Sequence, residues 1–314
     1  MKEESLYLPS EHEDLLKLYV RKYQPDDQPV KAILVLAHGM VEHGARYAPL
    51  AETLTKEGFI VYAYDHRGHG KSDSPVKGQV VYAKRAGREA VVNDLLTITS
   101  YAKKEYPGIP VSLFAHSMGS YIARNTLFKG SKDFDAVIFS GTGPTQKPLA
   151  YLGIFVSGIL KKIFKDENPS NFMTATAFAG FNSKCKPRRT DFDWLSRDEK
   201  EVDKYLSDPL CGSKATAGFW HDFLRLLESA NDKKQIAAME KLDLPILLIN
   251  GSKDPAVLYH KGPKKVFSLF QSAGLTDVEL KIYDEARHEL VNEINREEVI
   301  SDILSFLQSK LGLT

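Results

Sequence analysis

The sequence is poor in cysteine and has no excess of either charge. Two cysteines in 314 residues, Cys185 and Cys211, are too few for a disulfide framework, and we expect two reduced thiols rather than a pair. The net charge is +1, so nothing indicates the concentrated basic surface that a nucleic-acid partner requires. The N-terminal stretch MKEESLYLPSEHED lacks the apolar core of a signal peptide, which predicts a cytoplasmic protein.

Metal-ligand spacing is also missing. No cluster of histidine, cysteine and carboxylate residues has the spacing of a metal site, and we expect neither a metal nor a cofactor.

Short apolar runs alternate with helical patterns over most of the chain. After two strands within residues 5–23, buried strands are expected at 32–37, 60–64, 111–114, 136–139, 245–250 and 278–283. Helices are expected over residues 47–57, 83–105, 121–129, 263–273 and 292–311. Strands that are apolar on both faces and alternate with helices indicate a mostly parallel sheet flanked by helices, the α/β class.

The alternation stops between Pro144 and Lys241, where only helical patterns and loops occur. We therefore predict a core formed by residues 1–143 and 242–314, with residues 144–241 inserted as a helical cap. The segment Pro148–Phe164 is the most apolar part of this insertion, but its uncharged run is too short to span a bilayer.

One predicted strand ends at a serine in the setting of a nucleophile elbow. In VSLFAHSMGS (residues 111–120), an apolar strand leads into Ser117 and a helical pattern follows at once. The turn needs small residues two positions before and after the serine, here Ala115 and Gly119, although the usual first residue is glycine. A buried structural serine is the alternative that this motif alone leaves open.

A serine nucleophile needs a base, and His288 is the candidate. It follows the last predicted strand and precedes the last helix, so its side chain can turn back over the sheet edge. His66 and His69 lie in a glycine-rich turn, where a structural role is expected.

The base in turn needs an orienting carboxylate, and Asp254 is the candidate because it follows the strand PILLING. Asp284 is its rival, but it lies only four residues before His288. The order Ser117, Asp254, His288 is that of the α/β-hydrolases.

An oxyanion hole is expected from two backbone N–H groups. The first belongs to Met118, directly after the serine, and the second to Met40, in the loop His38-Gly39-Met40 after the strand AILVLA. Gly39 permits the backbone conformation that aims such an amide inward.

Five segments, HGMVEHGARY, DHRGHGKS, AHSMGS, GSKDPAV and ARHE, resemble the monoglyceride lipase and lysophospholipase-like branch of the α/β-hydrolases, also known as the serine aminopeptidase S33 type. The resemblance runs from about residue 30 to the C-terminus and implies an α/β-hydrolase fold. It places the same triad on Ser117, Asp254 and His288 and the same oxyanion donors on Met40 and Met118. Ala115 and Ser120 depart from the family's GHSMGG pattern, and Ser120 is expected to narrow the packing behind the elbow.

The leading hypothesis is a cofactor-independent serine hydrolase that cleaves carboxylic esters of the monoacylglycerol or lysophospholipid type through an acyl-enzyme. An aminopeptidase is the alternative; it would need an acidic cap pocket, for which only Glu228, Asp198 and Glu199 are available, without compelling spacing. A non-catalytic binding protein on the same fold would be expected to have lost part of the triad.

The cap carries the remaining predictions. Its apolar segment is either a helix buried against the core or, as the resemblance suggests, a lid that touches lipid aggregates, with Lys147, Lys161, Lys162 and Lys165 facing an anionic surface. Its aromatic residues fit either a substrate pocket or core packing equally well; they are Phe192, Trp194, Phe219, Trp220 and Phe223. The sequence makes no prediction of oligomeric state.

Overall fold

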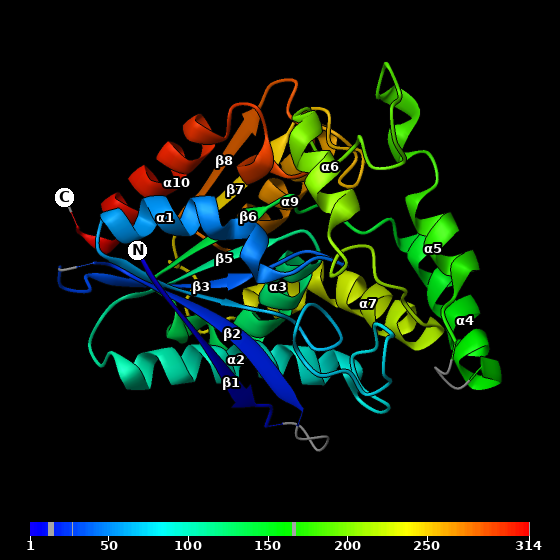
Figure 1. Cartoon of the computed structure of the whole chain (residues 1–314), viewed down its shortest axis with the longest axis horizontal. Helices are drawn as coiled ribbons and strands as arrows, with labels where there is room; N and C mark the ends of the chain where they lie inside the picture. The colour runs from blue at the N-terminus through cyan, green and yellow to red at the C-terminus, as the bar shows by residue number, and fades with distance from the viewer. Residues whose placement is uncertain (12–15, 27, 165–167, 314) are drawn as a thin grey trace.

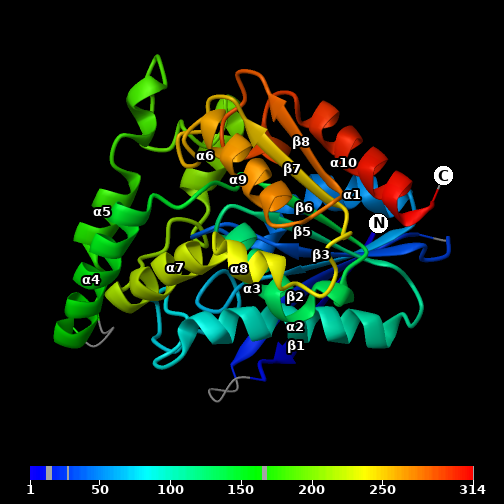
Figure 2. The same ribbon diagram turned by 180° about the vertical axis from the view of Figure 1, so that it is seen from behind.

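The centre of the molecule is a single eight-stranded sheet, seen in a computed structural model that describes residues 1–11, 16–26, 28–164 and 168–313 (Figures 1 and 2). The strand order is β1-β2-β4-β3-β5-β6-β7-β8. β1 and β2 form an antiparallel hairpin that joins the edge of β4, and all pairings from β4 to β8 are parallel. The predicted mostly parallel sheet is therefore confirmed. The strands are β1 (Lys2–Pro9), β2 (Lys17–Gln24), β3 (Ala32–Ala37), β4 (Phe59–Tyr64), β5 (Val111–His116), β6 (Ala136–Ser140), β7 (Ile246–Gly251) and β8 (Val278–Tyr283).

Helices cover both faces of this sheet. α1 and α10 pack on one face, and α2, α3 and α9 pack on the other (Figures 1 and 2). The helices are α1 (Ala48–Lys56), α2 (Gly87–Glu105), α3 (Met118–Gly130), α4 (Lys147–Phe164), α5 (Asn171–Phe178), α6 (Glu199–Ser207), α7 (Ala217–Ala230), α8 (Lys233–Ala237), α9 (Lys261–Ser272) and α10 (Arg296–Leu311).

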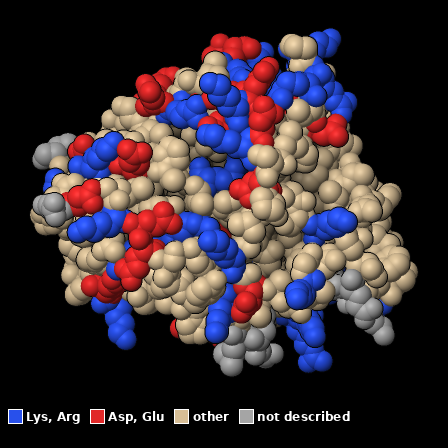
Figure 3. Space-filling model, viewed as in Figure 1, with Lys and Arg blue, Asp and Glu red and all other residues tan. Residues whose placement is uncertain are grey.

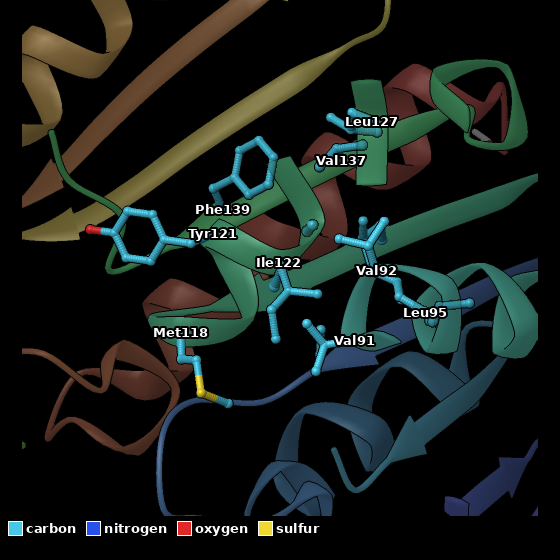
Figure 4. Packing of buried hydrophobic residues seen from close by; sticks show 14 of the residues in the cluster. Val91, Val92, Leu95, Met118, Tyr121, Ile122, Leu127, Val137 and Phe139 are labelled. Atoms are coloured by element: carbon cyan, nitrogen blue, oxygen red, sulfur yellow. The ribbon is translucent and has the colours of Figure 1, made fainter. Parts of the chain in front are cut away.

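Alternation along the strands produces two separate cores. In β3, Ile33 and Val35 belong to the cluster under α2 and α3, whereas Leu34 and Leu36 belong to the cluster under α1 and α10. Both faces are buried, which explains why the strand is a continuous aliphatic run. Figure 4 shows the first cluster, where residues of α2 meet Ile122 of α3 beside the strand residues of β6.

Two helices, α2 and α10, each begin four residues later than the sequence predicts. α2 begins at Gly87 rather than at residue 83, because Ala86 has a left-handed backbone conformation (φ 49°) that no α-helix can include. α10 begins at Arg296 rather than at residue 292, because Leu290–Asn292 form a separate 3₁₀ turn. Both boundaries depend on local backbone angles that residue type does not specify.

Residues 144–241 contribute helices α4 to α8 and, in their described part, none of the eight strands. α4 packs on α7, and α7 packs in turn on α2 and α3 of the core. α4 and α5 lie at one side of the molecule, away from the sheet (Figures 1 and 2). The division into core and cap at residues 144 and 241 stays a prediction. Among the described helices, none combines the length and the apolar character needed to cross a bilayer.

Candidate active site

Ser117 lies in a sharp turn between β5 and α3. Its backbone has φ 49° and ψ −118°, a conformation that is strained for any residue with a side chain. The strand ends at His116 and the helix begins at Met118, so this single residue makes the whole change of direction. The side chain is half-buried and lies at the carboxyl end of β5, where ligands bind in open α/β sheets.

The residues around the serine explain the motif. A Cβ atom on Gly119 would lie 2.3 Å from the carbonyl oxygen of Ala37, so only glycine fits there. Ala115 is fully buried and pairs in register with Ala37 of β3 and Phe139 of β6. The hydroxyl of Ser120 donates a hydrogen bond to the carbonyl oxygen of Ser117 (2.6 Å) and thereby ties the elbow to the first turn of α3.

Three side chains that the sequence predicts to act together lie in one hydrogen-bonded row. His288 Nε2 is 2.8 Å from Ser117 Oγ, and His288 Nδ1 is 2.7 Å from Asp254 Oδ2. Asp254 follows β7 and is fully buried; its second oxygen accepts a hydrogen bond from the Ala256 amide at 2.9 Å. The row can pass a proton from the serine hydroxyl to the imidazole, whose other nitrogen is held by a carboxylate.

Electrostatics favour the protonated form of His288. Burial acts to lower the pKa of His288, but the adjacent Asp254 carboxylate, helped by Glu289 and Glu42, outweighs burial and raises that pKa above its ordinary value. The neighbouring His116 ring, 4.7 Å away, has its pKa lowered well below the ordinary value, first by burial and then by the charge on His288. His116 therefore stays neutral beside the base.

The other candidates for the carboxylate and the base contact residues outside the triad. Asp284 is exposed and accepts a hydrogen bond from Ser252 Oγ at 3.0 Å. His66 and His69 are buried under the loop that follows β3, and the backbone N–H of His66 donates to His38 Nε2 at 2.9 Å. Their contacts agree with the structural role that the sequence indicated.

The loop after β3 lies against the serine. A Cβ atom on Gly39 would be 3.4 Å from the Cβ of Ser117, so the segment that includes Met40 lies directly beside the elbow. The Gly39 amide donates to Glu42 Oε1 at 2.5 Å, which fixes the course of this loop. The positions fit the expected oxyanion hole, but the roles of the Met40 and Met118 amides stay a prediction.

Sequence reasoning missed a buried ion-pair chain beside the triad. Arg46 contacts Glu42 at 2.7 Å and Glu289 at 2.6 Å, and it thus joins the loop after β3 to the loop that carries His288. Glu42 and Arg46 stand in the quoted motif HGMVEHGARY, but nothing in their spacing shows that both charges are buried. Gly141 was also missed: a Cβ atom there would lie 3.0 Å from His288 Cε1.

One aromatic residue of the insertion reaches the site. The ring of Trp194 is 5.1 Å from that of His288, and the Leu195 carbonyl accepts a hydrogen bond from the Glu289 amide at 2.8 Å. Ser196 Oγ donates to the Asn292 carbonyl at 2.8 Å. By contrast, Phe219, Trp220 and Phe223 belong to the core under α2 and α3. Trp194 also packs in a small separate cluster with Leu195 and Tyr205, against which Phe192 lies. Core packing thus accounts for all five aromatic residues, and a part in a substrate pocket stays a prediction.

Among the described residues, His43, Asp208 and Cys211 bring a nitrogen, an oxygen and a sulfur within 4.8 Å of one another. His43 Nε2 and Asp208 Oδ2 already form a hydrogen bond of 2.9 Å. Burial raises the pKa of the Cys211 thiol, which disfavours the thiolate that binds metals. We assign no metal to this group. Cys185 and Cys211 are both free thiols.

Comparisons with known proteins show the family and the fold. The family model described as serine aminopeptidase S33 matches residues 28–295. A monoglyceride lipase of Rattus norvegicus is 31% identical over 88% of this chain and 81% of its own length, and a monoacylglycerol lipase of Mycolicibacterium smegmatis is 29% identical over 92% of each. Among solved structures, a carboxyl esterase from Bacillus coagulans has a TM-score of 0.89 at 24% identity, covering 99% of both chains, and shows the same fold.

Proposed function

Because this chain belongs to the serine aminopeptidase S33 family of α/β-hydrolases and is a carboxylic-ester hydrolase, we propose that Ser117, His288 and Asp254 hydrolyse monoacylglycerol-like esters. The observation that carries this proposal is the row of two short hydrogen bonds, 2.8 Å and 2.7 Å, that links the strained serine to a buried carboxylate through His288. The monoglyceride lipases among its relatives support a lipid ester as substrate.

The first half of the reaction forms an acyl-enzyme. Ser117 Oγ attacks the ester carbonyl while His288 Nε2 takes the hydroxyl proton, and Asp254 stabilises the imidazolium that results. The amides of Met40 and Met118 donate to the oxyanion of the tetrahedral intermediate. His288 then gives its proton to the leaving alcohol oxygen as the carbon–oxygen bond breaks.

The second half returns the enzyme to its starting state. Water attacks the acyl carbon while His288 Nε2 accepts one of its protons, and the imidazolium then reprotonates Ser117 Oγ as the carboxylic acid departs. No group outside the triad, the two amides and water is needed to balance either half.

The three carboxylates considered for an aminopeptidase each contact a different residue. Asp198 forms an ion pair with Arg296 of α10, and Glu199 lies 3.9 Å from Arg189. Glu228 stands on α7 and hydrogen-bonds Tyr151 of α4. These contacts provide no shared site for the ammonium group of a peptide substrate. They therefore favour an ester as the substrate.

We further propose that α4 contacts lipid aggregates. Several of its large apolar side chains are exposed; Phe155 is 67% exposed, Ile163 63% and Leu152 59%. Lys147, Lys161 and Lys162 flank this surface, while Lys165 lies outside the described residues. The two free thiols support the further proposal of a reducing, cytoplasmic compartment.

The decisive experiment compares three substrate classes in parallel: monoacylglycerols of graded chain length, a lysophospholipid and aminoacyl anilides. We expect monoacylglycerols to have the highest kcat/KM. Faster cleavage of the anilides would contradict the proposed substrate class while leaving the nucleophile untouched.

A further inference from the structure

A cleft of about 770 Å³ opens between the start of α2, α4 and α7, and the triad residues do not line it. One wall is apolar and comes from α4, where Ile154, Phe155 and Ile159 line the space. The rim is basic and comes from all three helices, with Arg88 on α2, Lys162 on α4 and Arg225 on α7. Apolar and cationic groups thus meet in one hollow.

The cleft keeps positive charge after internal pairing. Arg88 binds Glu89 at 2.7 Å, and Lys161 lies 3.7 Å from Asp222, so the two acidic residues of the lining each have a basic partner. Lys162 and Arg225 form no ion pair with any residue that the structure describes. Both side chains are exposed. Among the described residues, an anion that enters the cleft therefore has no ion pair to displace before it meets these two cations.

The surface around the cleft is also basic and apolar. Lys84 and Arg85, immediately before α2, are also exposed. Outside the grey atoms, Figure 3 shows uncharged surface with scattered Lys and Arg and almost no Asp or Glu at the lower right, where Figure 1 places α4 and α7. Two of the exposed apolar side chains of α4, Phe155 and Ile159, line the cleft, and the others lie on the same helix.

From this juxtaposition we propose that the cleft binds the headgroup of an anionic phospholipid, so that the protein docks preferentially on anionic bilayers. The inference rests on the proposed contact of α4 with lipid and adds the charge selectivity of that contact. A basic rim beside an apolar wall complements a phosphate whose acyl chains lie in the adjoining hydrocarbon. A small soluble anion would satisfy the rim but leave the apolar wall and the exposed side chains of α4 in water.

The test measures partition of the full-length protein onto vesicles of phosphatidylcholine alone and of phosphatidylcholine mixed with phosphatidylglycerol. We expect wild-type protein to bind the mixed vesicles more tightly, with the preference weakening as salt is added. The double variant Lys162→Glu/Arg225→Glu should lose at least about tenfold in partition onto the mixed vesicles, since each basic residue near such a surface contributes several-fold. Its binding to phosphatidylcholine alone should not change.

A matched control separates the cleft from net charge. Lys264→Glu/Lys265→Glu makes the same charge change at two exposed positions of α9 and should keep the preference for mixed vesicles. Equal losses in both double variants, or no loss in the first, would overturn the proposal. Displacement of the protein from mixed vesicles by soluble glycerol phosphate would also overturn it, because the cleft would then be a small-anion site.

Two further measurements distinguish a failure of the proposed lipid binding from a failure of the proposed ester hydrolysis. Hydrolysis of p-nitrophenyl butyrate should be unchanged in both double variants, which shows that they are folded. Leu152→Ser/Phe155→Ser should weaken binding to both kinds of vesicle. If it does not, the contact of α4 with lipid is wrong and the inference falls with it, whereas the ester-hydrolase assignment stands.

Discussion

The guanidinium of Arg46 donates two parallel hydrogen bonds, both 2.6 Å long, to the carboxylate of Glu289, the residue that follows His288. Bidentate pairs of this kind fix orientation as well as distance. The same guanidinium also donates to Glu42, which holds the Gly39 amide. One buried cation thus fixes the loop that carries His288 (the base loop) and the loop after β3 relative to each other.

Replacing Arg46 by alanine should destabilise the protein strongly. Two buried carboxylates, Glu42 and Glu289, would lose their cation, and breaking a buried pair in this way costs about 3–5 kcal/mol. Urea unfolding provides the measurement. Lys56→Ala is the matched control because Lys56 pairs with Glu52 on the exposed surface of α1; there we expect less than about 1 kcal/mol. Similar losses in the two variants would show that the buried pair contributes no more than the surface pair.

The two candidate carboxylates give a clear test of the triad. Asp254→Asn should lower kcat by about four orders of magnitude, because the amide cannot hold His288 in the correct tautomer. Asp284→Asn should have almost no effect, since that carboxylate is exposed and contacts Ser252. Steady-state hydrolysis of p-nitrophenyl esters measures both, with Ser117→Ala as the inactive reference. Substantial turnover by Ser117→Ala would contradict the proposed nucleophile.

A pair of glycines separates backbone strain from crowding of the base. Gly141 and Gly108 both have positive φ values, 62° and 80°, so alanine at either should cost about 1 kcal/mol of stability. Only at Gly141 would the new Cβ approach His288 Cε1, at 3.0 Å, whereas nothing lies within 4 Å at Gly108. We expect kcat to fall in Gly141→Ala alone. Equal kcat values in the two variants would show that the base tolerates the displacement.

Acid should destabilise the fold through buried histidines. Burial lowers the pKa of His66 to about 3 and that of His69 to about 4, from an ordinary value of 6.5. Because these folded-state values are depressed, the stability they contribute is complete above pH 6.5 and is lost as the pH falls towards 4 and then 3.

His66→Gln isolates this effect, because the glutamine amide can replace the imidazole N–H near the His38 carbonyl, now 3.0 Å from His66 Nε2. The free energy of unfolding of wild type should fall more steeply with acid than that of the variant. The difference is about 1.4 kcal/mol per pH unit, the value for one proton. Urea unfolding at a series of pH values below 6.5 measures it; identical slopes would mean that His66 does not titrate on unfolding.

The sequence predicts which catalytic candidates lie in the loops after the strands. Ser117 follows β5 directly, and Asp254 and His288 lie in the loops after β7 and β8; the carboxyl ends of parallel strands meet at one sheet edge. The positions of β3 to β7 were predictable because burial on both faces demands continuous apolar residues. The catalytic roles themselves stay predictions until the variants above are measured.

Tertiary burial and backbone angles were not predictable. Nothing in the spacing of Glu42 and Arg46 shows that their charges are buried, because that depends on Glu289, more than two hundred residues away in the chain. The late start of α2 follows from the left-handed conformation of Ala86, a residue that ordinarily favours helix. Trp194 and Phe219 have the same aromatic character in sequence, yet one contacts His288 and the other packs in the core.

The hydrogen bonds between the segment around Leu195 and the loop around Glu289 determine which parts of the insertion can be exchanged with relatives. A chimaera that takes α4 and α5 from another hydrolase would leave the base loop with its own partners. A chimaera whose donor segment runs through Ser196 would have to import the matching loop after β8 as well. Because the Asp193 carbonyl also accepts a hydrogen bond from Arg287, at 2.5 Å, an exchange that leaves the base loop intact must end before Asp193.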